Sequence, residues 1–321
     1  MPKALDRIFT LDVLRGVAAL SVVFWHWQHF FYVGDTSLGF DVSRQPFFDV
    51  LSLFYRHGSL AVELFFCISG FVFFWLFANK IADRKISAFG FFMDRYSRLY
   101  PLHILTFLIV ALLQFIYIQE HSTYFVYQIN DGYHALLNIL LIPAWGFEKG
   151  WSFNAPIWSV SVEFLLYGLF FVVCLTRRLF YLLIIALVVI GYIVYPLYYK
   201  LGSGIFTFFC GGVASLLLFK SKALLGTVAT CCTALLFFVV AWAIIMFSQG
   251  SNMYLIMGMA FPATVMFIAS LSLINPDLMK PFSAIGDLSY SSYLLHFPLQ
   301  MLFAMVSDKL GYSREIFYSP W

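Results

Sequence analysis

Long apolar stretches separated by short polar connections run along the whole chain. A helix needs about 20 predominantly apolar residues to cross a bilayer. Nine stretches approach or exceed this length, at residues 11–33, 57–79, 100–119, 155–176, 179–196, 203–219, 223–247, 251–274 and 290–307. The pattern predicts an all-α fold, a polytopic transmembrane helical bundle of nine spans that forms one integral membrane domain over residues 1–321, with no appended soluble domain.

The composition supports a membrane protein. Apolar residues make up 62% of the chain and charged residues 11%, whereas a soluble domain has about 25% charged residues. The net charge of +3 is spread over several connections and does not indicate a nucleic-acid partner. All five cysteines fall inside apolar stretches, without a C-x-x-C pair. The first stretch is too long and too charged for a cleaved signal peptide and is predicted to be retained.

The basic residues predict the orientation of the chain. The connections on one side hold twelve Lys and Arg residues, and those on the other side hold six. The positive-inside rule places the richer side in the cytoplasm, together with the N-terminus and the connection 80–98. Segments 34–56 and 119–154 are then expected outside. Within the second of these, residues 133–145 are too short to span and are expected to be interfacial or re-entrant.

Three ionisable residues interrupt the first apolar stretch: Asp12, Arg15 and His26. Such groups are costly within a span and indicate a functional site by default. In an α-helix, His26 returns to nearly the face of Arg15, about 16 Å deeper in the membrane, and Asp12 can pair with Arg15 one turn away. His29 is expected to lie off this face, at a wetter helix end. The alternative is an interfacial charge pair and a structural core histidine.

A second polar position precedes the third span. Segment 86–100 is expected to form an amphipathic helix at the inner surface, with Arg95 and Arg98 one turn apart. Two arginines at this spacing can clamp a phosphate. Alternatively, they anchor the helix at the cytoplasmic face.

Three further polar residues lie in later spans. Glu163 shares a predicted helix face with Ser159 and can orient an imidazole or a sugar hydroxyl, or it can be a buried packing residue. His296 in the last span is compatible with a functional or a structural role. Glu63 lies near the outer end of the second span, where it is either solvated or has a structural role.

Four separated motifs follow one another along the chain. They are LDVLRGVAALSVVFWH with Arg15 and His26, DRYSRLYPL with Arg95 and Arg98, WSVSVEFLLYG with Ser159 and Glu163, and SYSSYLLHFPL with Tyr293 and His296. Their order resembles the acyltransferase-3 family of integral membrane acyltransferases, which modify bacterial polysaccharides, nodulation factors and macrolides. The resemblance extends over essentially the whole chain.

The resemblance implies acyl-CoA, most often acetyl-CoA, as the cytoplasmic donor, and a hydroxyl of a cell-surface or lipid-linked glycan as the acceptor. It implies roles for nine residues. The catalytic residues are His26, Glu163 and Asp12. The donor-binding residues are Arg15, Arg95 and Arg98, and the acceptor-binding residues are Ser159, Tyr293 and His296. His26 then acts as a general base or as a transiently acylated relay. Asp12 is expected to orient Arg15, and Glu163 to orient His26 or the acceptor.

The resemblance also implies a bacterial inner-membrane protein that acts alone or with a separate extracytoplasmic transferase or glycan-assembly partner. The family has ten spans with both ends inside, whereas nine are counted here and the chain ends on the outer side. The histidines do not cluster with Cys or Asp at metal-ligand spacing, so no metal is expected.

Two other classes remain open. A secondary transporter or polysaccharide exporter can use intramembrane Asp, Arg and His residues as a proton relay, although the chain lacks the internal repeat of many transporters. A scaffold without catalytic activity is the third possibility. Labelled acetyl-CoA separates an enzyme from a transporter, because only an enzyme transfers the label covalently to the glycan.

Overall fold

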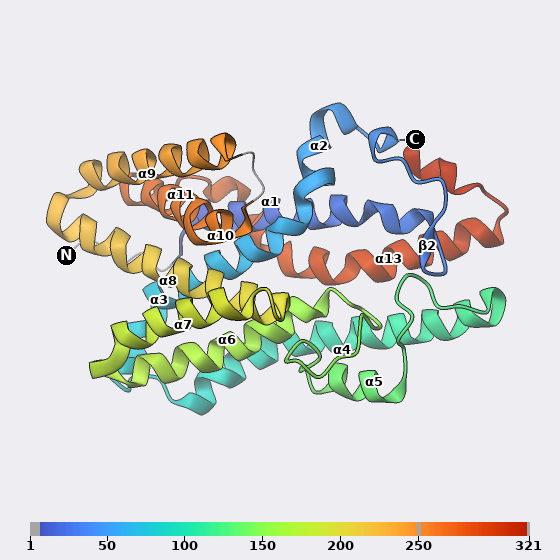
Figure 1. The fold of residues 1–321 in the computed structure, drawn as a ribbon, viewed down its shortest axis with the longest axis horizontal. Helices are drawn as coiled ribbons and strands as arrows, with labels where there is room; N and C mark the ends of the chain where they lie inside the picture. Colours follow the sequence, from blue (N-terminus) through green and yellow to red (C-terminus); the bar gives the residue numbers. More distant parts are fainter. Residues whose placement is uncertain (1–6, 249–251, 320–321) are drawn as a thin grey trace. The chain divides into compact units, whose positions relative to one another are not determined.

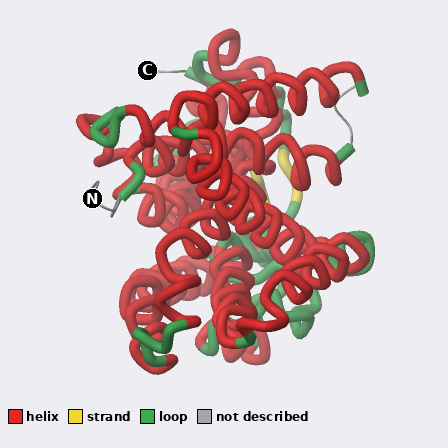
Figure 2. Tube along the Cα trace, turned by 90° about the vertical axis from the view of Figure 1, so that its left-hand side faces the viewer, coloured by secondary structure: helices red, strands yellow, loops and turns green. Residues whose placement is uncertain are grey.

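The computed structural model describes residues 7–248 and 252–319, and these are almost entirely helical (Figure 2). The α-helices are α1 (Phe9–Trp25), α2 (Phe48–His57), α3 (Ala61–Ala82), α4 (Ala88–His121), α5 (Gly132–Ile139), α6 (Ile157–Leu175), α7 (Phe180–Val194), α8 (Tyr199–Leu225), α9 (Thr227–Phe247), α10 (Met253–Leu255), α11 (Phe261–Ile274), α12 (Ser283–Asp287) and α13 (Ser289–Lys309).

Shorter elements connect these helices. They are the antiparallel strands β1 (Tyr32–Val33) and β2 (Thr36–Ser37), the 3₁₀ helices η1 (His26–Phe31), η2 (Val42–Arg44), η3 (Gly58–Leu60), η4 (Arg177–Leu179), η6 (Lys280–Phe282) and η7 (Arg314–Tyr318), and the π-helix η5 (Ile256–Ala260). Lys3, which contributes to the predicted orientation, and the last two residues of the chain lie outside the described residues.

Eight segments of the described chain are long and apolar enough to cross a membrane. They are Phe9–Phe31, Phe48–Ala82, Ala88–His121, Ile157–Leu175, Arg177–Val194, Tyr199–Leu225, Thr227–Phe247 and Met253–Ile274. This confirms the prediction of a polytopic helical membrane protein. The ninth expected span, 290–307, coincides with the 21-residue helix α13, which is long enough but is not among these eight apolar segments. The span count and the orientation of the N-terminus stay predictions.

The third span differs from the expectation. The predicted surface helix over 86–100 and the predicted span over 100–119 form one continuous helix, α4, of 34 residues. Pro101 lies inside this helix, where it removes one backbone hydrogen bond. The rings of Tyr96 and Tyr100 stack across the preceding turn, with centroids 4.4 Å apart. The proline therefore marks a position within α4 and not a helix boundary.

The chain folds into two compact units. The first unit contains residues 1–17, 62–93 and 162–288, and the second contains residues 18–61, 94–161 and 289–321. Four of the five boundaries fall inside helices α1, α3, α4 and α6, and the fifth falls between α12 and α13. Each unit is therefore assembled from several separate segments of the chain, and the prediction of one domain over residues 1–321 stays a prediction.

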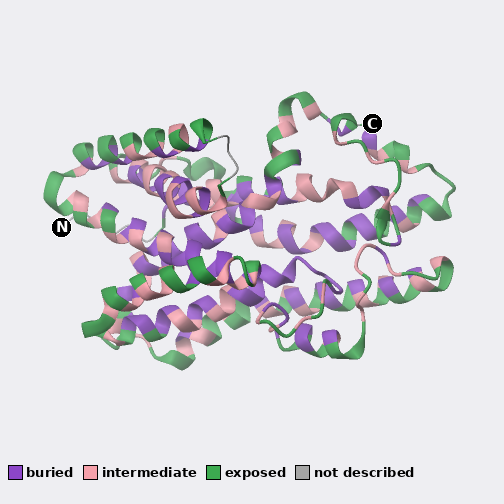
Figure 3. Ribbon diagram, viewed as in Figure 1, coloured by how far each residue is buried: buried purple, intermediate pink, exposed green. Residues whose placement is uncertain are grey.

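In the first unit, α8 packs against α7, α9 and α11 (Figure 1). It also lies close to α3, because a Cβ at Gly70 would overlap the carbonyl of Phe208, and one at Gly211 would overlap the carbonyl of Cys67. Small residues allow such close approach of helices within membranes. The outer faces of α7 and α9 are exposed and apolar (Figure 3). Exposed apolar helix faces of this kind are expected where a protein meets lipid.

In the second unit, the core forms between α4, α13 and the long connection 122–156. Phe107 and Tyr117 of α4 pack with Phe125 of the connection and with Phe297 and Met301 of α13. All five side chains are buried. This core holds α13 and the connection 122–156 in fixed positions within the unit.

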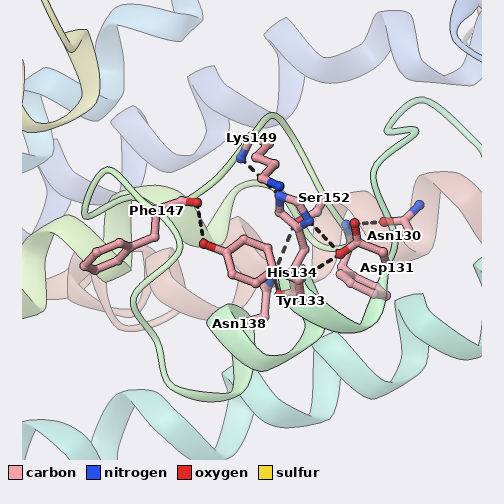
Figure 4. Close-up of polar contacts among 9 residues, drawn as sticks. Asn130, Asp131, Tyr133, His134, Asn138, Phe147, Lys149 and Ser152 are labelled. Carbon is pink, nitrogen blue, oxygen red and sulfur yellow. Dashed lines mark hydrogen bonds and ion pairs between the residues drawn. The ribbon is translucent and has the colours of Figure 1, made fainter.

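A fully buried histidine organises the connection 122–156 (Figure 4). Nδ1–H of His134 donates to Oδ1 of Asp131 over 2.7 Å, and Nε2 accepts from the backbone N–H of Lys149 over 3.1 Å. Asp131 also caps α5 by accepting from the backbone N–H of His134. These two hydrogen bonds hold the pKa of Asp131 below its ordinary value. Residues 133–145 thus form a short helix followed by turns, and their place relative to the membrane stays a prediction.

Candidate active site

His26 begins the 3₁₀ helix η1 of the second unit, directly after the last residue of α1. A 3₁₀ helix has about 3.0 residues per turn, so side chains at i and i+3 lie on the same side. The rings of His26 and His29 accordingly lie 4.8 Å apart, and His29 is 5% exposed. The expectation that His29 lies off the face of His26 at a wetter helix end is wrong. It assumed an α-helical period, whereas the helix tightens at His26.

A third histidine comes from α13, which packs against η1. The ring centroids of His26 and His296 lie 4.8 Å apart, at an interplanar angle of 39°. His296 is buried. His26, His29 and His296, called the histidine cluster below, therefore combine one end of the chain with the other.

Backbone carbonyls determine the tautomers of two members of the cluster. Nδ1 of His26 lies 2.9 Å from the carbonyl oxygen of Val22, and Nδ1 of His296 lies 2.6 Å from that of Tyr293. A carbonyl oxygen only accepts, so Nδ1 carries the proton in both rings. In the neutral rings, Nε2 is then the basic atom. Each imidazole is thus held in the tautomer that a general base requires.

Gln300 of α13 forms hydrogen bonds to both η1 histidines of the cluster. Its Nε2 donates to the backbone carbonyl of His26 over 3.1 Å, and its Oε1 accepts from Nδ1–H of His29 over 3.3 Å. The side chain is 3% exposed. The sequence offers one signal for Gln300, a lone amide one helical turn after His296 in an apolar helix. The sequence analysis did not identify it.

The start of α6 is tied to the first turns of α13. The hydroxyls of Ser159 and Tyr293 lie 2.9 Å apart, and the Tyr293 hydroxyl also donates to the carbonyl of Pro156 over 2.9 Å. Asn154 donates from Nδ2 to the carbonyl of Leu294 over 3.1 Å. The structure therefore brings Ser159, Tyr293 and the His296 turn of α13 together. Asn154 was not identified from the sequence.

Arg95 and Arg98 lie on consecutive turns of α4 in the second unit, before Pro101. Arg98 is exposed and Arg95 is partly exposed. The i, i+3 spacing places both guanidinium groups toward neighbouring positions on the helix surface. This placement is compatible with an anion clamp and with membrane anchoring, and the role of the pair stays a prediction.

The charged residues at the start of α1 form a network in the first unit. Asp12 pairs with Arg15 over 3.7 Å and accepts a hydrogen bond from Arg7. Arg7 also donates to Asp287 over 2.6 Å, and Arg15 donates to the carbonyl of Gly286 over 3.0 Å. Hydrogen bonding to Asp12 raises the pKa of Arg7. Asp12 is thus shared between two arginines, of which the sequence analysis identified one.

Glu163 also belongs to the first unit. Its Oε1 accepts a hydrogen bond from the Ser69 hydroxyl over 2.7 Å. An action of Glu163 on His26 or on the acceptor stays a prediction. Glu63 is 8% exposed, so the expectation of a solvated side chain is wrong for it.

In the residues that the structure describes, no three or more His, Cys, Asp or Glu side chains are arranged to hold a metal ion. In the histidine cluster, the Nδ1–H groups of His26 and His296 are bound to carbonyls, so proton transfer is available at Nε2.

Comparisons with known proteins identify the family. The Acyl_transf_3 family model, described as an acyltransferase domain, matches residues 8–321. The chain belongs to this family. The match includes both compact units of the acyltransferase-3 protein and confirms the resemblance found in its motifs.

Two curated relatives match parts of this acyltransferase-3 protein. "Acyltransferase MdmB" of Streptomyces mycarofaciens is 32% identical over 169 residues, which is 52% of this chain and 39% of the relative. "Protein 2 in picA locus" of Rhizobium radiobacter is 34% identical over 106 residues, which is 33% of this chain and 45% of the relative. The matched part thus spans less than half of each relative's length. No solved structure matches the chain.

Proposed function

We propose that this acyltransferase-3 protein is a membrane-embedded acyltransferase. It moves an acyl group, most often acetyl, from cytoplasmic acyl-CoA to a hydroxyl of a cell-surface or lipid-linked glycan. The observation that carries the proposal is the tautomer of His26, whose Nδ1–H is held by the Val22 carbonyl so that Nε2 is the basic atom. The family and the relative named as an acyltransferase support acyl transfer.

His26 acts as the general base in this proposal. Its Nε2 takes the proton of the acceptor hydroxyl while the hydroxyl oxygen attacks the thioester carbon. The carbon–sulfur bond then breaks, and the imidazolium returns the proton to the CoA thiolate. The products are the acylated acceptor and free CoA. In the alternative relay, Nε2 of His26 itself attacks the thioester carbon and expels the CoA thiolate. The acceptor hydroxyl then takes the acyl group from Nε2, and its proton goes to the CoA thiolate.

The remaining polar residues serve binding and positioning. Arg95 and Arg98 hold the phosphates of CoA at the cytoplasmic face, together with Arg15, which Asp12 orients. Glu163 orients the base or the acceptor. We place the protein in the bacterial inner membrane, where it works alone or with a separate extracytoplasmic transferase or glycan-assembly partner. These assignments rest on the family motifs and on the charges of the residues.

Substitution of His26 tests the proposal. We expect His26→Ala and His26→Gln to lower transfer of label from [¹⁴C]acetyl-CoA to membrane glycan by about 10²–10⁴, the usual effect of losing a general base. CoA binding and protein level should stay near those of the wild type. His121→Gln is the matched control, because Nδ1 of His121 also bonds a carbonyl four residues earlier, that of Tyr117, and no ring contact with the cluster involves it.

Two results would contradict the proposal. If His26→Gln kept nearly full activity, His26 could be neither the base nor an acylated relay. If the wild-type protein moved substrate across the membrane without any covalent label in the glycan, the transporter alternative would replace the enzyme.

A further inference from the structure

Two buried hydrogen-bond acceptors, one in the histidine cluster and one on a side chain that binds α13 close to it in sequence, lack a partner in the described part of the chain. Oδ1 of Asn154 and Nε2 of His296 have no hydrogen-bond partner among the residues that the structure describes. Asn154 is 0% exposed and His296 is 5% exposed. Nearly all buried polar atoms in proteins are hydrogen-bonded, so unpartnered ones call for an explanation.

The two side chains bind adjacent backbone carbonyls of α13. Asn154 donates from Nδ2 to the carbonyl of Leu294, and His296 donates from Nδ1 to the carbonyl of Tyr293, which is the adjacent residue of α13. Each side chain therefore uses its donor to hold the same turn of α13. These bonds also fix the amide orientation and the ring tautomer, because a carbonyl cannot donate. The unpartnered atom of each side chain is thus an acceptor.

The two unpartnered hydrogen-bond acceptors restrict the chemical class of ligand that can bind here. A ligand that satisfies them must bring hydrogen-bond donors, which phosphate groups and a thioester carbonyl lack. The hydroxyls of a polyol or sugar are such donors. The His296 ring lies 4.8 Å from that of His26, so a hydroxyl held here lies next to the proposed base.

We propose that Asn154 and His296 form the subsite that binds the hydroxyl groups of the acceptor. One hydroxyl donates to Oδ1 of Asn154 and a neighbouring one to Nε2 of His296, which leaves Nε2 of His26 for the hydroxyl that is acylated. This inference rests on the proposed function, and it adds Asn154 to the binding residues. The amide N–H groups of the CoA pantetheine arm are the other groups near a thioester that could donate hydrogen bonds to Asn154 and His296.

Apolar replacement of Asn154 tests the subsite. Asn154→Leu keeps the number and branching of the side-chain heavy atoms and removes both the Oδ1 acceptor and the Nδ2 donor to Leu294. Asn138→Leu is the matched control, because Asn138 is also buried, has an unpartnered Oδ1 and donates from Nδ2 to a carbonyl, that of His134. His296→Gln keeps an acceptor at the second position, and His296→Leu removes it.

Three quantities are measured for each variant. They are the thermal stability of the purified protein, the affinity for CoA, and the transfer of [¹⁴C]acetyl to glycan. Transfer is measured in membranes of the native host, from cells that lack the wild-type gene and express the variant. We expect Asn154→Leu to lower transfer roughly ten- to a hundredfold at saturating acetyl-CoA, with CoA affinity unchanged. Asn138→Leu should lower stability comparably and change transfer by less than about twofold. His296→Gln should retain more transfer than His296→Leu.

The outcomes separate the inference from the proposed function. Wild-type transfer in Asn154→Leu, or equal transfer in the two His296 variants, would overturn the subsite. A loss of CoA affinity that parallels the loss of transfer would overturn the subsite as well, since Oδ1 of Asn154 and Nε2 of His296 would then bind the amide N–H groups of the pantetheine arm. A wild-type protein that transfers no label would refute the proposed function itself, and the subsite with it.

Discussion

Replacing Gln300 with leucine tests how strongly the position of His26 depends on its support. Gln300 is buried on α13 and holds both η1 histidines, through the His26 carbonyl and the Nδ1–H of His29. Leucine has a similar volume but neither a donor nor an acceptor. The substitution therefore leaves the imidazole of His26, the proposed base, chemically unchanged and removes the hydrogen bonds that position it.

The size of the effect follows from the two bonds. A buried hydrogen bond contributes about 1 kcal/mol net, and an unsatisfied buried partner costs about 1–3 kcal/mol. We therefore expect the free energy of unfolding to fall by about 2–4 kcal/mol. Since a displacement of about 1 Å at a reacting group can cost about 10²-fold in rate, kcat should fall roughly ten- to a hundredfold. The affinity for CoA should not change.

Gln114→Leu supplies the matched control. Gln114 is 1% exposed and makes two hydrogen bonds of 2.8 Å to the backbone of Phe125, which is not a member of the histidine cluster. Its loss should lower stability by a similar amount and leave kcat nearly unchanged. The assay is transfer from labelled acetyl-CoA at matched amounts of folded protein, together with thermal unfolding of each purified variant.

The comparison of the two glutamines decides the question. If both variants lost stability and activity to the same extent, the effect of Gln300 would be general destabilisation and not positioning. Unchanged kcat in Gln300→Leu would refute the reasoning outright, because the cluster would then keep its geometry without the amide.

Three further predictions concern the donor site, the orientation and the outer connection. Arg95→Ala or Arg98→Ala should weaken CoA binding roughly ten- to a hundredfold, with only partial rescue by lysine; unchanged affinity in the double variant would leave membrane anchoring as their role. A cysteine at Ser87, in a protein without its native thiols, should resist an impermeant reagent added outside intact cells, and labelling there would reverse the predicted orientation. The hydrogen bonds from His134 lower the pKa of Asp131 from its ordinary 3.8, so their stabilising effect is present above that value and is lost as the pH falls through the lower folded pKa. Thermal unfolding between about pH 6 and pH 3 should therefore show a smaller acid-induced loss of stability in Asp131→Asn than in the wild type, and equal losses would contradict this.

The membrane architecture could be predicted because its cause is local. A stretch that must cross a bilayer has to be long and apolar, whatever it packs against. The eight apolar spans of the structure accordingly match eight of the nine expected stretches. The ends were less predictable. The surface helix expected over 86–100 and the span expected over 100–119 form the single helix α4, which continues through Pro101.

The histidine cluster was only partly predictable. The motifs identified His26 and His296 singly, but no pattern along the chain reports that rings 270 residues apart lie 4.8 Å from each other. His29 was misjudged because the helix changes from α to 3₁₀ at His26, where η1 packs against α13. Gln300 and Asn154 were missed for a related reason. A lone buried amide has no periodicity, and only its partners show what it holds.

The sequence by itself thus determined the membrane-spanning character, the family and the identity of the main candidate site residues. Each of these follows from the composition or from short sequence motifs. Only the structure showed which nitrogen of His26 and His296 is basic, since backbone carbonyls four and three residues earlier in the chain hold the Nδ1 protons. It likewise decided that the chain's first and last parts meet in one cluster. Hydrogen-bond partners and ring distances between remote segments arise from packing, and packing follows from the whole chain and not from any stretch of it.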